Sequence, residues 1–501
     1  MQTAAIFGDG MILQRDKPLR IWGDAAPGAR IVVDLEGAPA TTATADADGR
    51  WSTTLPPRDA ARGLTLTVSG EDERIVHRDV SIGEVWIAGG QSNMEFVLDF
   101  DADRERVFTG PMNPDIRFFD VPKTSYEGQE KEHDYSLSGW WRSCTPEDLR
   151  YFSAAGYYFA EQLQAALGVP VGIVGCNWGG TPASAWTPRA ALADGPGAVW
   201  LEDFDAGLRE LDVEEEAAAY RAHRASDRSN PFRDPFLNRL MRDGISKEDE
   251  AEFLPAFRAN FYPTVGSLHP CRPGGLFDTM VGRIAGYAAR GVIWYQGESD
   301  IAHPELHGTV LETVIRTWRD AWDDRELPFL ITQLAPFGST AVGDGDLFPV
   351  IRHQQAVTAA TVPLTWMASS SDAGAEFDIH PKNKEPIGVR LALLARRHVY
   401  GQDVAADAPE LDRAERTATG VDLRLRHAAG LTAGDADLPL TVTGPDGEPV
   451  PVAGVDVDDE VLRIHGSIPI GSTISFAWTG YYTVDLRNGA GLPAHPFQVT
   501  V

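Results

Sequence analysis

The chain has 501 residues, of which 43% are hydrophobic and 23% are charged, a composition typical of globular proteins. At this length we expect two or three domains rather than one core. Acidic residues outnumber basic ones by 73 to 44, which gives a formal net charge of -29. Nucleic acids and anionic membrane surfaces would repel such a charge, so the composition argues against both as partners.

The cysteines and the first residues bear on compartment and cofactors. Three cysteines, Cys144, Cys176 and Cys271, are few and odd in number, which predicts buried thiols and no disulfide framework. No cluster of ligands has zinc spacing, so we expect no metal and no cofactor. Residues 1–7 contain neither a basic segment nor the start of a long apolar segment, so we expect no signal peptide and no membrane span. We therefore expect a cytoplasmic protein, or a secreted one if a leader has been removed.

Residues 1–80 are predicted to form short strands. Ile21–Gly23, Arg30–Leu35, Trp51–Leu55 and Leu64–Val68 carry β-branched residues in partial alternation. Turn signals such as Asp-Gly and Pro-Pro separate them. Regularly spaced short strands indicate an N-terminal β-sandwich. We expect a structural domain there, with a sugar-binding module as the alternative.

From residue 81 to about 400 strands and helices alternate. Val85–Ala88 is an apolar strand, Phe152–Leu163 has helical spacing of large apolar residues, and Pro170–Val174 is the next strand. Further along, Val292 begins another buried strand, and helices are expected at 311–322 and 388–399. This order predicts an α/β fold with a doubly wound parallel sheet, whose functional site lies at the carboxyl ends of the strands.

Two other segments differ from this pattern. Residues 195–265 contain acidic helix formers, Val213–Tyr220 and Lys247–Leu254, which predict a helical insertion. We interpret it as a solvent-exposed helical insertion. Because it lies between site motifs, a role at the rim of the functional site stays open. Residues 401–501 return to short strands such as Val421–Leu425, with Asp-Gly and Gly-Pro turns. They are expected to form a C-terminal β domain.

One serine follows a strand end in a pattern typical of hydrolases. The strand Val85–Ala88 runs into Gly89-Gly90, and Ser92 comes two residues later. A sharp turn after a strand exposes a nucleophilic hydroxyl, and glycine permits that turn. A helix-capping serine is the alternative. Because Asp378 and His380 follow far downstream, the chain also offers an acid and a base in the order Ser, Asp, His.

Several motifs together resemble the sialate O-acetylesterase family of the SGNH (GDSL-like) hydrolase superfamily. The four that carry the resemblance are Gly90-Gln91-Ser92-Asn93-Met94, Trp178-Gly179-Gly180-Thr181, Trp294-Tyr295-Gln296-Gly297-Glu298-Ser299 and Asp378-Ile379-His380-Pro381. Further matches lie at Met11–Arg15, Arg272–Leu276 and Gly491–Phe497, so the resemblance covers nearly the whole chain. Four motifs in the right order are far more specific than any one of them.

The resemblance implies a serine esterase with an SGNH-type sheet flanked by helices, which removes O-acetyl groups from a carbohydrate. Ser92 would be the nucleophile, His380 the base, and Asp378 the acid that holds the imidazole. In the superfamily at large the acid stands three positions before the histidine, where this chain has Phe377. The acid therefore stays open between Asp378 and alternatives: Asp372, Glu376 or a backbone carbonyl.

The same resemblance implies donors for the oxyanion. They are the backbone N–H groups of Ser92 and of Gly179 or Gly180, and the side-chain amide of Gln296 in place of the superfamily's usual asparagine. A structural role within the strand end is the alternative for Gln296. The residues expected to contact substrate are Gln91, Asn93, Trp178, Glu298 and Arg272, and Glu298 is expected to lie behind those that touch the substrate directly.

The expected partner is an acetylated sugar or glycan. An O-acetyl sialic acid and an acetylated polysaccharide such as xylan both remain open. The acidic composition disfavours an anionic sialic acid unless Arg272 or Arg352 binds its carboxylate. A non-catalytic carbohydrate-binding protein on a hydrolase scaffold is the alternative from another class, and the presence of all three triad residues argues against it.

Overall fold

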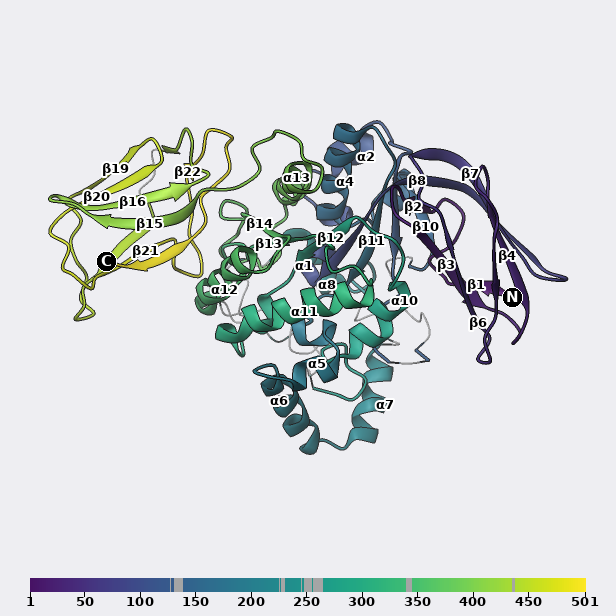
Figure 1. Ribbon diagram of the computed structural model, residues 1–501. Helices are drawn as coiled ribbons and strands as arrows, with labels where there is room; N and C mark the ends of the chain where they lie inside the picture. The colour runs from purple at the N-terminus through teal and green to yellow at the C-terminus, as the bar shows by residue number, and fades with distance from the viewer. Residues whose placement is uncertain are drawn as a thin grey trace.

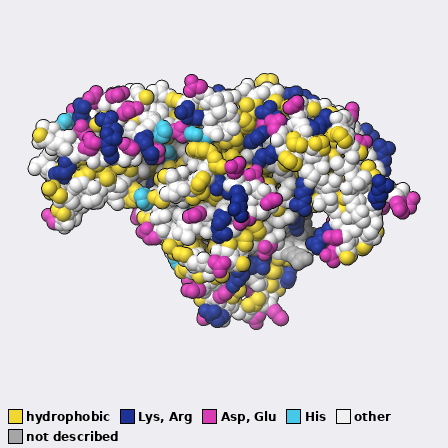
Figure 2. Space-filling model, viewed as in Figure 1, with side chains coloured by type: hydrophobic (Ala, Val, Ile, Leu, Met, Phe, Trp, Pro, Cys, Tyr) yellow, Lys and Arg dark blue, Asp and Glu magenta, His cyan; other side chains and the backbone are white. Residues whose placement is uncertain are grey.

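The computed structural model describes the chain except for residues 127, 130–137, 225, 227–229, 245, 247–254, 256–264, 339–344 and 435–437. Three regions follow one another along the molecule (Figure 1): an N-terminal β region, a central α/β region and a C-terminal β region. The predicted α/β chain with β regions at both ends is thus confirmed in outline. Acidic and basic side chains are mixed over the visible surface (Figure 2).

The N-terminal region contains short strands whose side chains alternate between core and solvent, as in β3. Its strands are β1 (Gln2–Thr3), β2 (Ile12–Gln14), β3 (Leu19–Asp24), β4 (Arg30–Leu35), β5 (Thr41–Thr44), β6 (Arg50–Leu55) and β7 (Ala61–Ser69). One sheet has the order β1-β3-β6. The others reach the next strand, β8 (Arg74–Gly90), through the pairs β2–β8 and β7–β8. The boundary expected at residue 80 therefore falls within a continuous strand.

The central sheet has the order β10-β9-β11-β8-β12-β13-β14. Its other strands are β9 (Ile116–Asp120), β10 (Trp141–Ser143), β11 (Val171–Asn177), β12 (Gly291–Tyr295), β13 (Phe329–Thr332) and β14 (Thr365–Ala368). All neighbours are parallel except β9 and β10. β9, β11, β12 and β13 are buried along their whole length, as expected for a sheet covered on both faces.

Helices cover both faces of this sheet. Among the described residues they are α1 (Ser92–Glu95), α2 (Arg104–Thr109), α3 (Pro146–Leu149), α4 (Ala154–Leu167), α5 (Arg189–Ala193), α6 (Ala198–Arg209), α7 (Val213–Arg224), α8 (Pro235–Asp243), α10 (Gly282–Ile284), α11 (His307–Ala321), α12 (Phe348–Thr361) and α13 (Glu385–Leu394). Along β8, Trp86 and Ala88 pack with residues of α4 and α13, whereas Val85 and Ile87 belong to the cluster that contains α11. This alternation follows the two-residue period of a strand.

The insertion expected at 195–265 is helical where the structure describes it. α6, α7 and α8 form there, and α6 and α7 project away from the sheet (Figure 1). The second acidic segment, Lys247–Leu254, lies outside the described residues. No helix in the described part of the chain is both long and apolar enough to cross a membrane.

The C-terminal region has its own apolar core. Its strands are β15 (Glu410–Arg416), β16 (Gly420–Arg426), β17 (Thr432–Ala433), β18 (Leu440–Thr443), β19 (Gly454–Asp458), β20 (Val461–His465), β21 (Thr473–Phe476), β22 (Leu486–Arg487) and β23 (Phe497–Thr500). Arg352 joins this region to the central one, because its buried guanidinium donates to the carbonyls of Leu334, Ala335, Thr479 and Gly480. Its donors are thus used inside the protein, which corrects the suggestion that it binds a substrate carboxylate.

Candidate active site

Three adjacent parallel strands end at the same edge of the sheet. Gly90 at the end of β8 pairs with Asn177 of β11 on one side and with Tyr295 of β12 on the other. Gly90 has φ +132°, and a Cβ there would lie 2.1 Å from the Tyr295 carbonyl oxygen. Only glycine fits such a turn. The chain therefore leaves β8 sharply, and Ser92 opens the short helix α1 directly above the strand ends.

Gln91 holds two of these strand ends together. Its buried side-chain Oε1 accepts hydrogen bonds from the backbone N–H groups of Gly297, at 3.2 Å, and Ser299, at 3.3 Å. A side chain used in this way is fixed before any ligand binds. In this structure Gln91 therefore positions the turns after β8 and β12, whereas the sequence suggested a substrate contact.

Asn93 links the serine turn to the histidine loop. Its Nδ2 donates to the carbonyl oxygen of Ile379 at 2.9 Å and to Oε1 of Glu298, and its Oδ1 accepts from Lys384 Nζ at 2.6 Å. Asn93, Glu298 and Lys384 are all at least nine-tenths buried. One side chain thus connects the residue after Ser92, the β12 turn and the segment that contains the expected base.

Lys384 is a buried cation that the sequence analysis missed. Burial lowers the pKa of Lys384 to about 7, and the nearby carboxylates of Asp378 and Glu298 oppose that shift. Burial in turn raises the pKa of the Glu298 carboxyl, which the Asn93 hydrogen bond and the charge of Lys384 partly offset. The two ionisable groups therefore share one buried polar network beneath the serine turn.

His380 lies beside this network with a neutral imidazole at neutral pH. Burial, together with the charges of Lys382 and Lys384, lowers the pKa of His380 well below its usual range. Its ring stacks on Phe96 with centroids 6.5 Å apart. Its buried Nδ1 has no hydrogen-bond partner among the residues described. A neutral imidazole can accept a proton, which is what a general base requires.

Asp378 holds the backbone of the histidine loop. Oδ1 accepts the backbone N–H of His380 at 2.9 Å, and Oδ2 forms an ion pair with Lys382 Nζ at 2.9 Å. In this structure the carboxylate is bonded to the loop instead of the imidazole ring. The alternative acid Asp372 is engaged elsewhere, by Arg390 and Arg487 at 2.7 Å.

Gly179 lies directly against the serine. A Cβ on Gly179 would be 3.2 Å from Cβ of Ser92. The Gly179 N–H, one of the expected oxyanion donors, donates to Oε2 of Glu95 at 2.5 Å, and Oε1 of Glu95 pairs with Lys123 Nζ at 3.0 Å. The sequence analysis missed Glu95, although its place three residues after Ser92 puts it on the same side of a helical turn.

Gly180 and Gln296 differ in what surrounds them. A Cβ on Gly180 would meet open space, so a ligand can approach its backbone. Gln296 is fully buried, and its Nε2 donates to Asp300 Oδ2 at 3.2 Å and to the Thr181 carbonyl oxygen at 3.4 Å. Asp300 also binds His307 Nδ1 at 2.8 Å. This arrangement favours the structural alternative for Gln296.

Trp178 and Arg272 are the remaining side chains expected to contact substrate. Trp178 is largely buried, and the guanidinium carbon of Arg224 on α7 lies 5.2 Å from its ring centroid. Arg272 donates to the Ser125 carbonyl oxygen at 3.2 Å. Trp294 packs in the core against Trp186 and Trp318.

The described part of the insertion also borders the site. Lys382 Nζ, which pairs with Asp378, donates to the Leu240 carbonyl oxygen of α8 at 3.0 Å. Arg242, also on α8, forms an ion pair with Asp99 at 2.6 Å. The insertion thus supports the histidine loop from outside.

Two thiols, Cys144 and Cys176, are buried, whereas Cys271 is partly exposed and donates to the Gly180 carbonyl oxygen at 3.2 Å. Across the described ranges, no group of three or more His, Cys, Asp or Glu side chains could hold a metal ion.

Comparisons with known proteins agree with this picture. A family model described as "Carbohydrate esterase, sialic acid-specific acetylesterase" matches residues 268–392. Sialate O-acetylesterases from Pongo abelii and Homo sapiens are each 27% identical over 434 residues, which is 80% of this chain and 71% of theirs. The crystal structure of a novel carbohydrate acetylesterase from Xanthomonas citri is similar over 100% of this chain and 99% of its own, with a TM-score of 0.77 and 29% identity. The resemblance of the sequence motifs to sialate O-acetylesterases is therefore confirmed, and the chain is a carboxylic ester hydrolase related to these enzymes.

Proposed function

We propose that this protein is a serine O-acetylesterase that releases acetate from an acetylated carbohydrate. The names of its relatives support the substrate class. One contact carries the mechanism: the hydrogen bond from Asn93 to the Ile379 carbonyl oxygen, which holds the neighbours of Ser92 and His380 together. Two residues that are 286 positions apart in the chain, Asn93 and Ile379, would thereby position the nucleophile and the base.

The reaction proceeds in two steps. Ser92 Oγ attacks the acetyl carbonyl carbon while His380 takes the hydroxyl proton, and the tetrahedral intermediate collapses as His380 returns that proton to the sugar oxygen. This leaves an acetyl group on Ser92. Water, deprotonated by His380, then attacks the acetyl carbon, and acetate leaves as Ser92 recovers its proton. The lowered pKa of His380 keeps the imidazole ready to accept a proton.

The oxyanion would be bound by backbone N–H groups beside the serine. We assign the N–H groups of Ser92 and Gly180 to it, since open space adjoins Gly180. The Gly179 N–H can join them once the Glu95 carboxylate moves away, and Lys123 offsets the negative charge of Glu95 meanwhile. Gln296 would serve by holding the β12 turn.

Asp378 would act on the base through the backbone. By accepting the His380 N–H it fixes the loop, and its negative charge, shared with Lys382, favours the imidazolium formed in the reaction. Lys384 and Glu298 hold Asn93 from either side, which makes them positioning residues for the serine turn. Gln91 has the same role between the two strand ends.

The experiment is acetate release from a panel of acetylated sugars that includes O-acetyl sialic acid and acetylated xylan, alongside 4-nitrophenyl acetate. Ser92→Ala should remain folded and lose hydrolysis of every ester. Ser69→Ala, at the end of β7, is the matched control and should keep full activity. Turnover by folded Ser92→Ala at the wild-type rate would exclude the serine mechanism. Release from none of the acetylated sugars, with 4-nitrophenyl acetate still cleaved, would exclude the carbohydrate substrate.

A further inference from the structure

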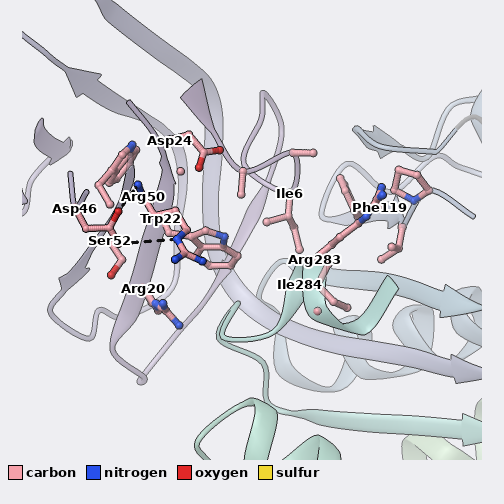
Figure 3. Close-up of a pocket in the computed structure, with 17 residues that line it drawn as sticks. Ile6, Arg20, Trp22, Asp24, Asp46, Arg50, Ser52, Phe119, Arg283 and Ile284 are labelled. Carbon is pink, nitrogen blue, oxygen red and sulfur yellow. Dashed lines mark hydrogen bonds and ion pairs between the residues drawn. The ribbon is translucent and has the colours of Figure 1, made fainter. Parts of the chain in front are cut away.

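A cavity of about 590 Å³ lies where the N-terminal β region meets the central region (Figure 3). Strands β3 and β6 supply one wall, which includes Arg20, Trp22 and Asp24. The end of β9 with the following loop, together with α10, supplies the other wall, which includes Pro122 and Arg283. The proposed mechanism uses none of these side chains.

Two guanidinium groups of the cavity lining have no hydrogen-bond or ion-pair partner in the described part of the chain. Neither Arg20 nor Arg283 makes a hydrogen bond or ion pair with any residue that the structure describes, whereas Arg50, in the same lining, pairs with Asp48 at 2.6 Å. Partial burial lowers the pKa of Arg283 and no charged neighbour opposes that shift, although the side chain remains exposed to solvent. Unpaired arginines on a concave surface are suited to an incoming carboxylate, which they can bind by two parallel hydrogen bonds.

The same cavity presents an aromatic ring beside polar groups. Trp22 is partly exposed and forms T-shaped contacts with Phe7, with centroids 4.7 Å apart, and with Tyr287, at 6.5 Å. The Arg20 guanidinium carbon lies 5.7 Å from the Trp22 ring centroid. Another lining residue, Trp51, keeps its buried indole N–H without an acceptor. A fixed ring flanked by hydrogen-bonding groups can bind the apolar face of a sugar and orient its hydroxyls.

We propose that this cavity is a second, non-catalytic binding site for a carboxylated pyranose, such as a uronic acid or a sialic acid unit of a glycan. Trp22 contacts the sugar face, Arg20 and Arg283 bind the carboxylate from opposite walls, and Asp24 accepts a sugar hydroxyl. The lining carries three arginines, Arg20, Arg50 and Arg283, against two carboxylates, Asp24 and Asp46, whereas the whole chain carries a formal charge of -29. Mixed donors and acceptors around a ring suit a sugar acid better than a small inorganic anion.

The cavity wall continues into the catalytic centre. Pro122 lines the cavity, and the next residue, Lys123, pairs with Glu95 beside Ser92. The hydroxyl of Thr124 donates to the carbonyl oxygen of Thr279 at 3.2 Å, which ties this loop to the segment before α10. The cavity is therefore connected to the catalytic centre through the backbone of this loop. Binding in the cavity does not depend on the proposed function.

The experiment measures binding to the full chain by titration calorimetry, with D-glucuronic acid, N-acetylneuraminic acid and D-glucose as probes. We expect the two acids to bind more tightly than glucose. Arg283→Ala and Arg20→Ala should each raise the Kd of the acids by about tenfold, the effect of one lost charge-assisted hydrogen bond. Arg413→Ala, at an exposed arginine of the C-terminal region, is the control and should leave the Kd unchanged. A difference between the two acids identifies the preferred sugar.

Three results would overturn the proposal: no binding of either acid, equal binding of glucose, or an unchanged Kd in a folded Arg283→Ala variant. Arg283→Lys keeps the positive charge and should recover part of the affinity, which separates loss of the charge from a fault in folding. The titration is repeated in Ser92→Ala, whose Kd should equal that of the wild type. If no acetylated sugar is hydrolysed while the acids still bind, the proposed esterase function fails and the cavity site stands.

Discussion

Asn93→Ala tests whether the serine turn is positioned by the buried network. The change removes hydrogen bonds to the Ile379 carbonyl, to Glu298 and to Lys384. A buried neutral hydrogen bond contributes about 1 kcal/mol and one to a charged group about 1.5–3 kcal/mol, so we expect a loss of about 4–7 kcal/mol in unfolding free energy. Urea unfolding followed by tryptophan fluorescence measures it.

The same variant should lose activity by more than its lower stability explains. Without Asn93 the hydrogen bond between the residue after Ser92 and the residue before His380 is lost, and a misplacement of about 1 Å costs about 10²-fold in rate. We therefore expect kcat/KM on 4-nitrophenyl acetate to fall by about 10²-fold under conditions where the protein is folded. Leu423→Ala is the matched control, because it empties a buried site in the C-terminal core at a cost of about 2–5 kcal/mol and should keep wild-type kcat/KM. Wild-type kcat/KM in folded Asn93→Ala would refute the reasoning.

Four further predictions concern the charge of Lys384, the pKa of His380, the β12 turn and metals. The pKa of Lys384 is lowered from 10.5 to about 7 in the folded state, so the unfolded chain binds more protons between these pH values and the unfolding free energy should rise with pH across that window. Lys384→Met should remove this contribution to the slope of unfolding free energy against pH, measured by urea unfolding at several pH values. A slope identical to that of the wild type would contradict the prediction. The lowered pKa of His380 predicts that the acid limb of the kcat/KM profile lies below pH 6.5, so a midpoint at or above that value would contradict a buried neutral base. Gln296→Ala should lower the unfolding free energy by about 1–3 kcal/mol because Asp300 loses a buried donor, and the acylation rate should fall by less than the roughly 10²–10³-fold typical of a lost oxyanion donor. Dialysis against EDTA should leave the rate unchanged, and a loss restored by zinc or calcium would contradict a metal-free mechanism.

Local patterns in the sequence were enough to predict the strand ends and the residues that follow them. The apolar run Val85–Ala88 followed by two glycines specified both the strand and the turn, because burial on both faces and a positive φ leave a clear local pattern. The boundary near residue 80 could not be predicted in the same way. Strand β8 continues across this boundary and pairs with different strands along its length. Such a change of partners leaves no turn or loop residues in the sequence.

The charged partners around the serine could not be predicted, since they depend on contacts distant in sequence. Asn93 and Lys384 are 291 residues apart, and neither has a local pattern that points to the other. Likewise the acid two residues before His380 was expected beside the imidazole, but the spacing alone does not specify whether its carboxylate meets the ring or the backbone N–H. The direction of a side chain depends on tertiary packing, which the periodicity of the sequence does not encode.

The continuity of β8 also bears on how the protein unfolds. Its first half pairs with β7 and its second half with β11 and β12, and one apolar cluster extends from Ile21 and Val33 to Val292 and Ile331. Separating the first strands from the rest would therefore break a hydrogen-bonded strand and a shared core at once. We therefore expect the two regions to unfold as one cooperative unit. The turn at Ser92 follows a 17-residue strand that is paired along both of its halves. Loosening the distant N-terminal sheet is therefore expected to disorder this single strand as far as Ser92, the proposed nucleophile.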